Sequence, residues 1–151
     1  MPVEQAKAVK AHALYVSGNE IMDTEEFHEG LFTVQDISSM RAVAALSPQP
    51  GQRILDICAA PGGKSIFTAL LMKDRGEILS GDIYEHKLRL IDQSVERLGI
   101  HVVKTRMQDA SAFEEELMES ADAVIADVPC SGLGVIRRRP EIKWKMTGET
   151  I

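Results

Sequence analysis

The sequence contains few cysteines, few aromatic residues and no long apolar run. Its two cysteines, Cys58 and Cys130, exclude a disulfide scaffold, and their spacing fits no zinc motif. No apolar stretch approaches the roughly 18 residues that a membrane-spanning helix needs. The first residues also lack the apolar core of a signal peptide. These absences predict a cytoplasmic protein with free thiols and no bound metal.

The remaining composition is typical of one folded domain. The 151 residues are 44% hydrophobic and 26% charged, which excludes a disordered tail and a fibrous protein. The formal net charge of −6 does not favour long-range attraction to nucleic acid. The charge is nevertheless uneven, because residues 137–145 hold five basic side chains against the single acid Glu141.

The apolar pattern becomes regular after a break rich in proline and glycine at residues 47–51. Before the break we expect a helix running into a strand over 6–15, a short strand over 31–34 and a helix over 38–46. After it, strands are expected at 53–57, 78–81, 102–107 and 123–126, and helices at 64–73, 85–98 and 114–118. This alternation predicts a parallel sheet with helices packed on its faces.

Polar residues follow each expected strand of that sheet. The pair Gly62 and Gly63 follows the first strand, and Asp82, Asp109 and Asp127 follow the next three. Ligands of open α/β sheets bind outside the carboxyl ends of the strands. Asp109 taken alone is more typical of a turn. Three acids at one edge together favour a binding site.

The glycine turn matches neither common phosphate-binding pattern. A phosphate loop would need glycine at Cys58, and the dinucleotide pattern of three spaced glycines is also missing. Glycines before a helix still allow a ligand to approach the backbone, and the helix start favours negative charge. Asp82, 19 residues after Gly63, stands where an acid binds ribose hydroxyls. S-adenosylmethionine, with its ribose and its carboxylate, suits this arrangement.

Four segments resemble the Sun/RsmB-type RNA cytosine-C5 methyltransferases. They are Asp56–Lys64 (DICAAPGGK), Asp127–Gly134 (DVPCSGLG), residues 137–144 and residues 30–39, and the resemblance covers roughly residues 28–145. It implies a Rossmann-like class I methyltransferase domain, with an incomplete, mostly parallel sheet and helices on both faces. It also implies S-adenosylmethionine as the methyl donor and RNA, in particular ribosomal RNA, as the substrate.

The resemblance assigns roles to individual residues. Asp82 would hold the ribose, Asp109 would lie by the adenine, and Asp127 would lie between the methionine end and the target base. Cys130 would assist release of the covalent adduct, while Lys64 and Asp127 position the base. The implied cofactor-binding residues are Cys58, Ala59, Ala60, Pro61, Gly62, Gly63, Lys64, Asp82, Asp109 and Asp127, and the implied RNA-binding residues are Arg137, Arg138 and Lys143.

The chemistry explains why a second cysteine is expected. Cytosine C5 becomes nucleophilic only after a thiolate adds to C6, and the base must leave its stack to be reached. In the family that thiolate belongs to a later Thr-Cys pair, which these residues do not contain. We therefore interpret residues 1–36 as a lead-in and 37–151 as a partial methyltransferase domain. Its fourth strand should present an unpaired apolar edge that favours self-association.

Three other interpretations fit parts of the sequence. Cys130 could itself be the nucleophile, as the Pro-Cys cysteine is in DNA cytosine-C5 methyltransferases. The chain could be a non-catalytic module that binds cofactor or RNA. An NAD-binding domain is opposed by the glycine pattern. Trp144 could stack on a base, although packing against the sheet is slightly favoured.

Overall fold

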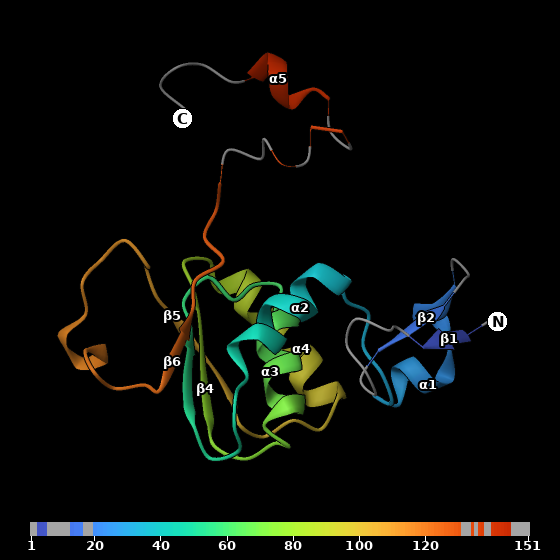
Figure 1. Cartoon of the computed structure of the whole chain (residues 1–151), viewed down its shortest axis with the longest axis horizontal. Coiled ribbons are helices and arrows are strands. Elements are labelled where there is room, and N and C mark those ends of the chain that lie inside the picture. The colour runs from blue at the N-terminus through green and yellow to red at the C-terminus, as the bar shows by residue number, and fades with distance from the viewer. Residues whose placement is uncertain are drawn as a thin grey trace.

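The computed structural model describes residues 3–5, 13–16, 20–130, 134, 136–137 and 140–145. Figure 1 shows a central sheet with helices beside it and a short hairpin at the N-terminal end. The elements are β1 (Val3–Gln5), β2 (Leu14–Val16), η2 (Ile21–Asp23), α1 (Glu25–His28), α2 (Ile37–Leu46), β3 (Arg53–Asp56), α3 (Gly63–Leu71), β4 (Glu77–Asp82), α4 (Glu85–Arg97), β5 (Val103–Met107), η3 (Glu115–Leu117), β6 (Ala123–Ile125) and α5 (Ile142–Lys145).

The four-stranded sheet confirms the parallel α/β prediction. Its order is β5-β4-β3-β6, and all three pairings are parallel. Leu55 of β3 pairs with Leu79 of β4 on one side and with Val124 of β6 on the other. The first strand of the alternation therefore lies inside the sheet. The loops after β3, β4 and β6 consequently open at one common edge.

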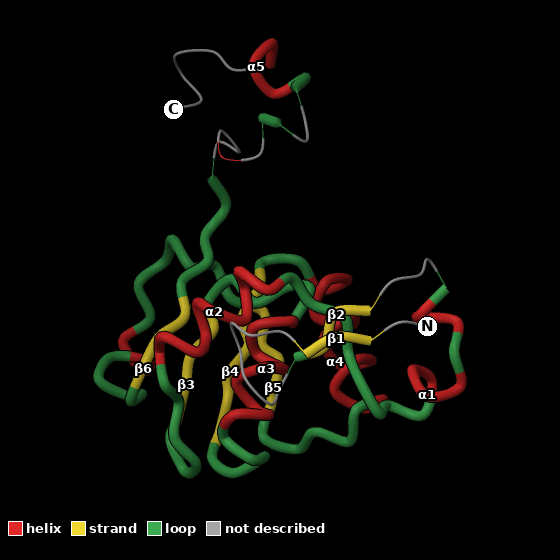
Figure 2. The backbone as a smooth tube through the Cα atoms, turned by 45° about the vertical axis from the view of Figure 1, so that its right-hand side comes forward, coloured by secondary structure: helices red, strands yellow, loops and turns green. Residues whose placement is uncertain are grey.

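The helices are distributed less evenly than expected. In Figures 1 and 2, α2, α3 and α4 lie on the same side of the sheet. On the other side runs the segment 108–122, where the helix expected over 114–118 is only the short 3₁₀ turn η3. Three consecutive glutamates at 114–116 offer no apolar stripe for a longer helix. Within the described residues, the expectation of helices on both faces is thus met on one face only.

The main core lies between the sheet and these helices. Ile54 of β3 and Ile78 of β4 are fully buried against Ile66 of α3 and Ile91 of α4. Each such side chain contributes roughly 1.5–3 kcal/mol on burial. A smaller cluster joins α2 to α3 through Val43 and Phe67. This packing fixes the start of α3 at the edge of the sheet where the loops converge.

The segment over residues 31–34 is not a strand, so that prediction was wrong. It lies outside the sheet, and the Arg97 guanidinium of α4 holds it by donating to the backbone oxygens of Phe27 and Phe32, the latter at 3.1 Å. The same guanidinium lies 3.8 Å from the Phe27 ring centroid. A Cβ on Gly30 would lie 1.8 Å from the Arg97 carbonyl oxygen, so only glycine fits there.

The segments near the two ends of the chain agree only in part with the sequence predictions. Residues 14–16 form the expected strand, paired antiparallel with β1, whereas the helix expected before it falls largely on residues outside the described ones. Trp144 is 81% exposed in α5, which lies apart from the sheet in both views, so packing against the sheet was wrong. Within the described residues, no helix is long and apolar enough to span a membrane.

Candidate functional site

The glycine turn after β3 is tied to both neighbouring strands. The Ile57 amide donates to the Ile125 oxygen of β6 at 3.1 Å, and the Ala59 amide donates to the Gly81 oxygen of β4 at 2.8 Å. Gly62 has φ +101°, and a Cβ there would lie 3.1 Å from Ile91 Cγ1. A side chain at this position would be both strained and crowded. The loop from Cys58 to Gly63 is therefore held rigidly at the carboxyl edge.

Helix α3 begins without a side-chain cap. Gly62 occupies the N-cap position and, having no side chain, accepts no hydrogen bond from the first amides of the helix. The first amides of a helix have no partner inside the helix, and the helix dipole makes this end partly positive. The start of α3 can consequently bind a carboxylate or another anionic group. The segment Cys58–Lys64 therefore includes a helix start that favours an anion, and its contact with a cofactor stays a prediction.

Asp82 lies beside the glycine turn, as expected. It ends β4, is 8% exposed, and its Oδ1 accepts from the Tyr84 amide at 3.1 Å and faces Lys87 Nζ at 3.7 Å. Ile83 and Tyr84 follow it, and half of each side chain is exposed. Sequence reasoning missed these two residues. Large apolar side chains placed directly after an acid at a strand end were the available signal.

Asp109 occupies a turn. Its Oδ1 accepts from the Ser111 amide at 2.9 Å and from the Ser111 hydroxyl at 2.6 Å. The hydroxyl bond and then the amide bond hold the pKa of this carboxyl below its ordinary value. The structure therefore shows the turn-forming role that is typical of an aspartate at such a position. Its role beside an adenine ring stays a prediction.

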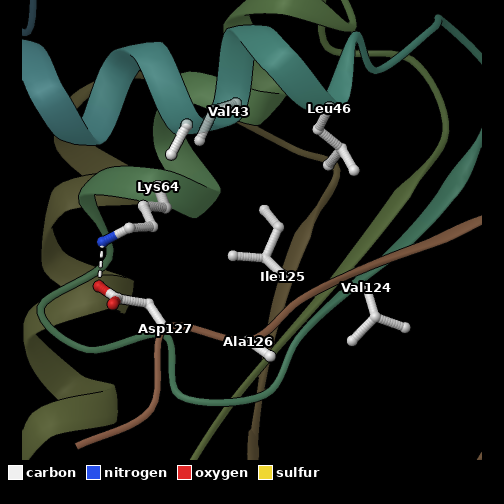
Figure 3. Close-up of a pocket in the computed structure, with 8 residues that line it drawn as sticks. Val43, Leu46, Lys64, Val124, Ile125, Ala126 and Asp127 are labelled. Carbon is white, nitrogen blue, oxygen red and sulfur yellow. Dashed lines mark hydrogen bonds and ion pairs between the residues drawn. The ribbon is translucent and has the colours of Figure 1, made fainter. Parts of the chain in front are cut away.

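Lys64 and Asp127 meet across two elements distant in the sequence. The Lys64 ammonium in the first turn of α3 pairs with Asp127 Oδ2 just after β6 (Figure 3). Lys64 is mostly covered, whereas the Asp127 side chain is 60% exposed. A hollow of about 240 Å³ adjoins this pair, and its apolar wall comes from α2, from β6 and from the residue after β6: Ala42, Val43, Leu46, Val124, Ile125 and Ala126.

A buried polar chain supports the same turn from below. Asp56 is fully buried, and its Oδ2 accepts from the Ser65 hydroxyl at 2.7 Å, which in turn accepts from the Ser80 hydroxyl at 2.7 Å. Burial raises the pKa of Asp56 to about 6. Its Oδ1 has no hydrogen-bond partner. Sequence reasoning gave Asp56 no role of its own, although a charged residue ending an apolar strand was a signal.

The two cysteines differ in their surroundings. Cys58 is partly buried, and burial, followed by the nearby carboxylates of Asp82 and Asp56, raises the pKa of its thiol. A thiol in such surroundings is a poor nucleophile at neutral pH. Cys130 is exposed and follows the last residue of β6, Ile125, by five positions. In the part of the chain that the structure describes, no hydrogen bond or ion pair joins Cys130 to Lys64 or Asp127.

The predicted RNA-binding residues lie partly outside the described residues. Arg137 is exposed, whereas Arg138 and the side chain of Lys143 lie outside the described residues. Among the residues that the structure does describe, no group of three or more His, Cys, Asp or Glu side chains could hold a metal ion. Gln35, another residue without an assigned role in the sequence, has a buried amide with no hydrogen-bond partner.

The parallel sheet with its glycine turn has the Rossmann-like fold of class I methyltransferases. A SAM-dependent O-methyltransferase from Thermotoga maritima shares this fold, with a TM-score of 0.56 at 21% identity over 77% of this chain and 43% of that one. The family model described as 16S rRNA methyltransferase RsmB/F matches residues 43–151. The chain therefore belongs to the RsmB/F methyltransferase family, as the sequence motifs predicted.

Individual relatives agree with this assignment. "Probable ribosomal RNA small subunit methyltransferase B" of Bacillus subtilis (strain 168) is 43% identical over 125 residues, covering 82% of this chain and 28% of that protein. The human "28S rRNA (cytosine(4447)-C(5))-methyltransferase" is 39% identical over 130 residues, 86% of this chain and 16% of that protein. The solved structure of PH0851 has a TM-score of 0.86 at 34% identity, over 99% of this chain and 34% of that one. The chain thus spans under a third of these curated relatives.

Proposed function

We propose that the chain is the cofactor-binding and base-positioning portion of an S-adenosylmethionine-dependent RNA cytosine-C5 methyltransferase, with ribosomal RNA as substrate. One observation carries the proposal: the uncapped glycine turn of α3 and the Asp82 carboxylate lie at the same edge of a RsmB/F-family sheet. The relatives named for methylation of ribosomal RNA, one of them at cytosine C5, support the substrate.

The residues present fit S-adenosylmethionine. The start of α3 suits the carboxylate of its methionine end, because unpaired amides and the helix dipole both favour an anion there. Asp82 suits the ribose hydroxyls, since the Tyr84 amide and the Lys87 ammonium both engage its Oδ1. Ile83 offers apolar surface for the adenine. The cofactor would supply an electrophilic methyl group.

Lys64 and Asp127 are the proposed groups that orient the target base. An ammonium donates and a carboxylate accepts, so the pair can hold the acceptor and donor atoms of a cytosine edge. Their ion pair keeps both groups at one point between α3 and β6. Cys130 then serves the release of the adduct. Cys58, with its raised pKa, is not suited to attack.

The RNA contact and the location belong to the same proposal. Arg137, Arg138 and Lys143 provide positive charge next to the active-site segment, where RNA phosphates would pass. A cytoplasmic location suits both a ribosomal RNA substrate and the unpaired cysteines. We keep residues 37–151 as part of the methyltransferase domain and 1–36 as its lead-in.

Calorimetric titration with S-adenosylhomocysteine tests the cofactor proposal. We expect the chain to bind this ligand, and Asp82→Ala to weaken binding by at least about 1 kcal/mol through the lost hydrogen bonds. Asp23→Ala is the matched control, because Asp23 is an exposed acid in η2, on the N-terminal lead-in. A folded chain that binds nothing would overturn the proposal, as would equal affinities of the Asp82 variant and the wild type.

A non-catalytic module that binds cofactor or RNA is the second candidate, favoured by the surroundings of Cys58, whose thiol has a pKa raised by burial and by nearby carboxylates. Both candidates bind the cofactor, so methyl transfer has to separate them. We expect the full-length protein containing this chain to transfer labelled methyl groups to ribosomal RNA. Lys64→Ala should abolish that transfer in the enzyme. A full-length protein that binds the cofactor and RNA but transfers no methyl group would instead be a binding module.

A further inference from the structure

Gln35 carries a carboxamide whose two polar atoms are buried and unbonded. Its Nε2 and Oε1 are both closed to solvent and have no hydrogen-bond partner in the structure. Burying an amide without partners costs free energy, and nearly all buried polar groups in proteins are satisfied. An orphaned donor and acceptor on one side chain therefore point to a partner that the described residues do not supply.

The amide lies at the glycine turn. A Cβ built on Gly63 would lie 3.4 Å from Gln35 Nε2, so the carboxamide rests against the bare side of the first residue of α3. This is the uncapped start of the helix, where an anionic group is favoured. The orphaned amide and the open helix start are two independent observations at one place.

The backbone on either side of Gln35 is fixed. The Arg97 guanidinium donates to the carbonyl oxygens of Phe27 and Phe32, and so anchors the segment that leads to Gln35. On the other side, Asp36 caps α2 by accepting from the Ser38 amide at 2.8 Å. Gln35 is thus presented between two anchors, which lowers the entropy cost of using it as a contact.

We propose that the Gln35 carboxamide binds the amino-acid end of the cofactor, which rests on the cofactor assignment made above. Nε2 would donate to the carboxylate at the start of α3, and Oε1 would accept from the ammonium. A carboxamide offers one donor and one acceptor side by side, which complements a zwitterion. The glutamine stem is flexible, so a rotation about χ3 turns the amide toward the ligand without moving the backbone.

The competing explanation is that Gln35 only fills the space beside Gly63. The two explanations differ in the empty chain. If the amide is an orphan kept for binding, replacing it with the similarly sized, apolar leucine removes a desolvation cost and leaves stability unchanged or higher. If it is a structural contact, Gln35→Leu lowers the melting temperature.

Comparing two ligands isolates the contribution of the cofactor's amino-acid end to binding. S-adenosylhomocysteine has it, whereas 5′-methylthioadenosine shares the nucleoside and lacks it. We expect Gln35→Leu to lower the affinity for S-adenosylhomocysteine about tenfold or more, because hydrogen bonds to charged groups are lost. The affinity for 5′-methylthioadenosine should change by less than about twofold, since no hydrogen bond to this ligand is lost. Gln93→Leu, at an exposed site on α4, is the matched control and should change neither affinity.

The outcomes separate this proposal from the one on which it rests. A wild-type chain that binds neither ligand defeats the cofactor proposal, and the role of Gln35 with it. Wild-type binding that Gln35→Leu leaves unchanged, or weakens equally for both ligands, overturns the role of Gln35 alone. A lowered melting temperature together with equal losses assigns Gln35 to packing. Selective loss of S-adenosylhomocysteine at unchanged melting temperature supports the proposed contact.

Discussion

Helices α2 and α3 pack against each other but begin in opposite ways. The start of α2 is capped, because Asp36 accepts from the Ser38 amide. The start of α3 has Gly62 in the cap position and no side-chain bond. Glycine in place of a side-chain cap costs only a few tenths of a kcal/mol, so α3 can leave its first amides open with little loss of stability. The difference indicates that the amides of α3 are left open for a ligand, while those of α2 serve the fold.

The uncapped helix is instead supported from within the core. Ser65 in its first turn bonds to the buried Asp56, and Ser80 of β4 bonds to Ser65. These groups lie beneath the turn and leave its outer side open. The two helix starts are therefore stabilised at different places. A capping side chain stabilises the first residues of α2, whereas buried hydrogen bonds beneath its first turn stabilise α3.

The largest expected effect concerns Asp56. Its pKa is raised to about 6 in the folded chain, against an ordinary 3.8 in the unfolded one. The folded chain therefore binds this proton more tightly, and Asp56 adds stability as the pH falls from about 6 toward about 4. The gap corresponds to about 3 kcal/mol. We expect the unfolding free energies of wild type and Asp56→Asn to diverge by about this amount when measured in urea across that window.

An exposed acid provides the control for this measurement. Asp23→Asn makes the same substitution at an exposed acid and so controls for the loss of one carboxyl group. Other carboxyls with lowered pKa values, such as Asp74 and Glu77, are common to both chains and cancel in the comparison. A wild type and an Asp56→Asn variant with parallel pH profiles would show that the buried carboxyl titrates normally.

The next effect concerns the glycine that replaces a cap. Gly62→Ala should lower the free energy of unfolding by about 2 kcal/mol, from left-handed backbone strain and crowding against Ile91. Gly99→Ala is the matched control, since Gly99 has φ +63° with no atom within 4 Å of a Cβ. Its loss should be about 1 kcal/mol from strain alone. Equal losses at the two glycines would remove the argument that Ile91 requires Gly62.

Local rules explain what the sequence could predict. The strand and helix alternation, the turn at Gly62 and the convergence of Asp82 and Asp127 on one edge follow from periodicity and from parallel topology. The strand over 31–34 was wrong, because a short apolar run carries no information on whether a sheet edge is available to it. The backbone carbonyl of Phe32 in that run is bound by Arg97, a residue 65 positions away.

Burial explains what the sequence could not predict. The orphaned amide of Gln35 and the raised pKa of Asp56 depend on what packs around them after folding. Neither residue type is unusual at its place in the sequence. Family resemblance pointed to Lys64 and Asp127, but their ion pair across α3 and β6 is visible only in the folded chain. Residue types therefore indicated the site, whereas the structure is needed for its electrostatics.

The smallest expected effect concerns the two edges of the sheet, which differ in charge. The β5 edge carries Lys104 and Arg106, both held in ion pairs, and charged edges resist strand pairing. The β6 edge has no charge, and Val124 is 51% exposed. Within the described residues β6 pairs only with β3. The apolar edge is consequently the one that should favour self-association of this chain.

Substitution at the β6 edge tests this difference. We expect the apparent mass in light scattering to rise with concentration, and Val124→Lys to weaken association by about 1 kcal/mol, the contribution of burying the exposed part of one valine. Val128→Lys adds the same charge outside the strand, at a residue that is 53% exposed, and should have little effect. A wild type that stays monomeric at every concentration would mean that the short β6 edge is too limited to pair. Equal effects of the two lysines would point to net charge instead of strand pairing.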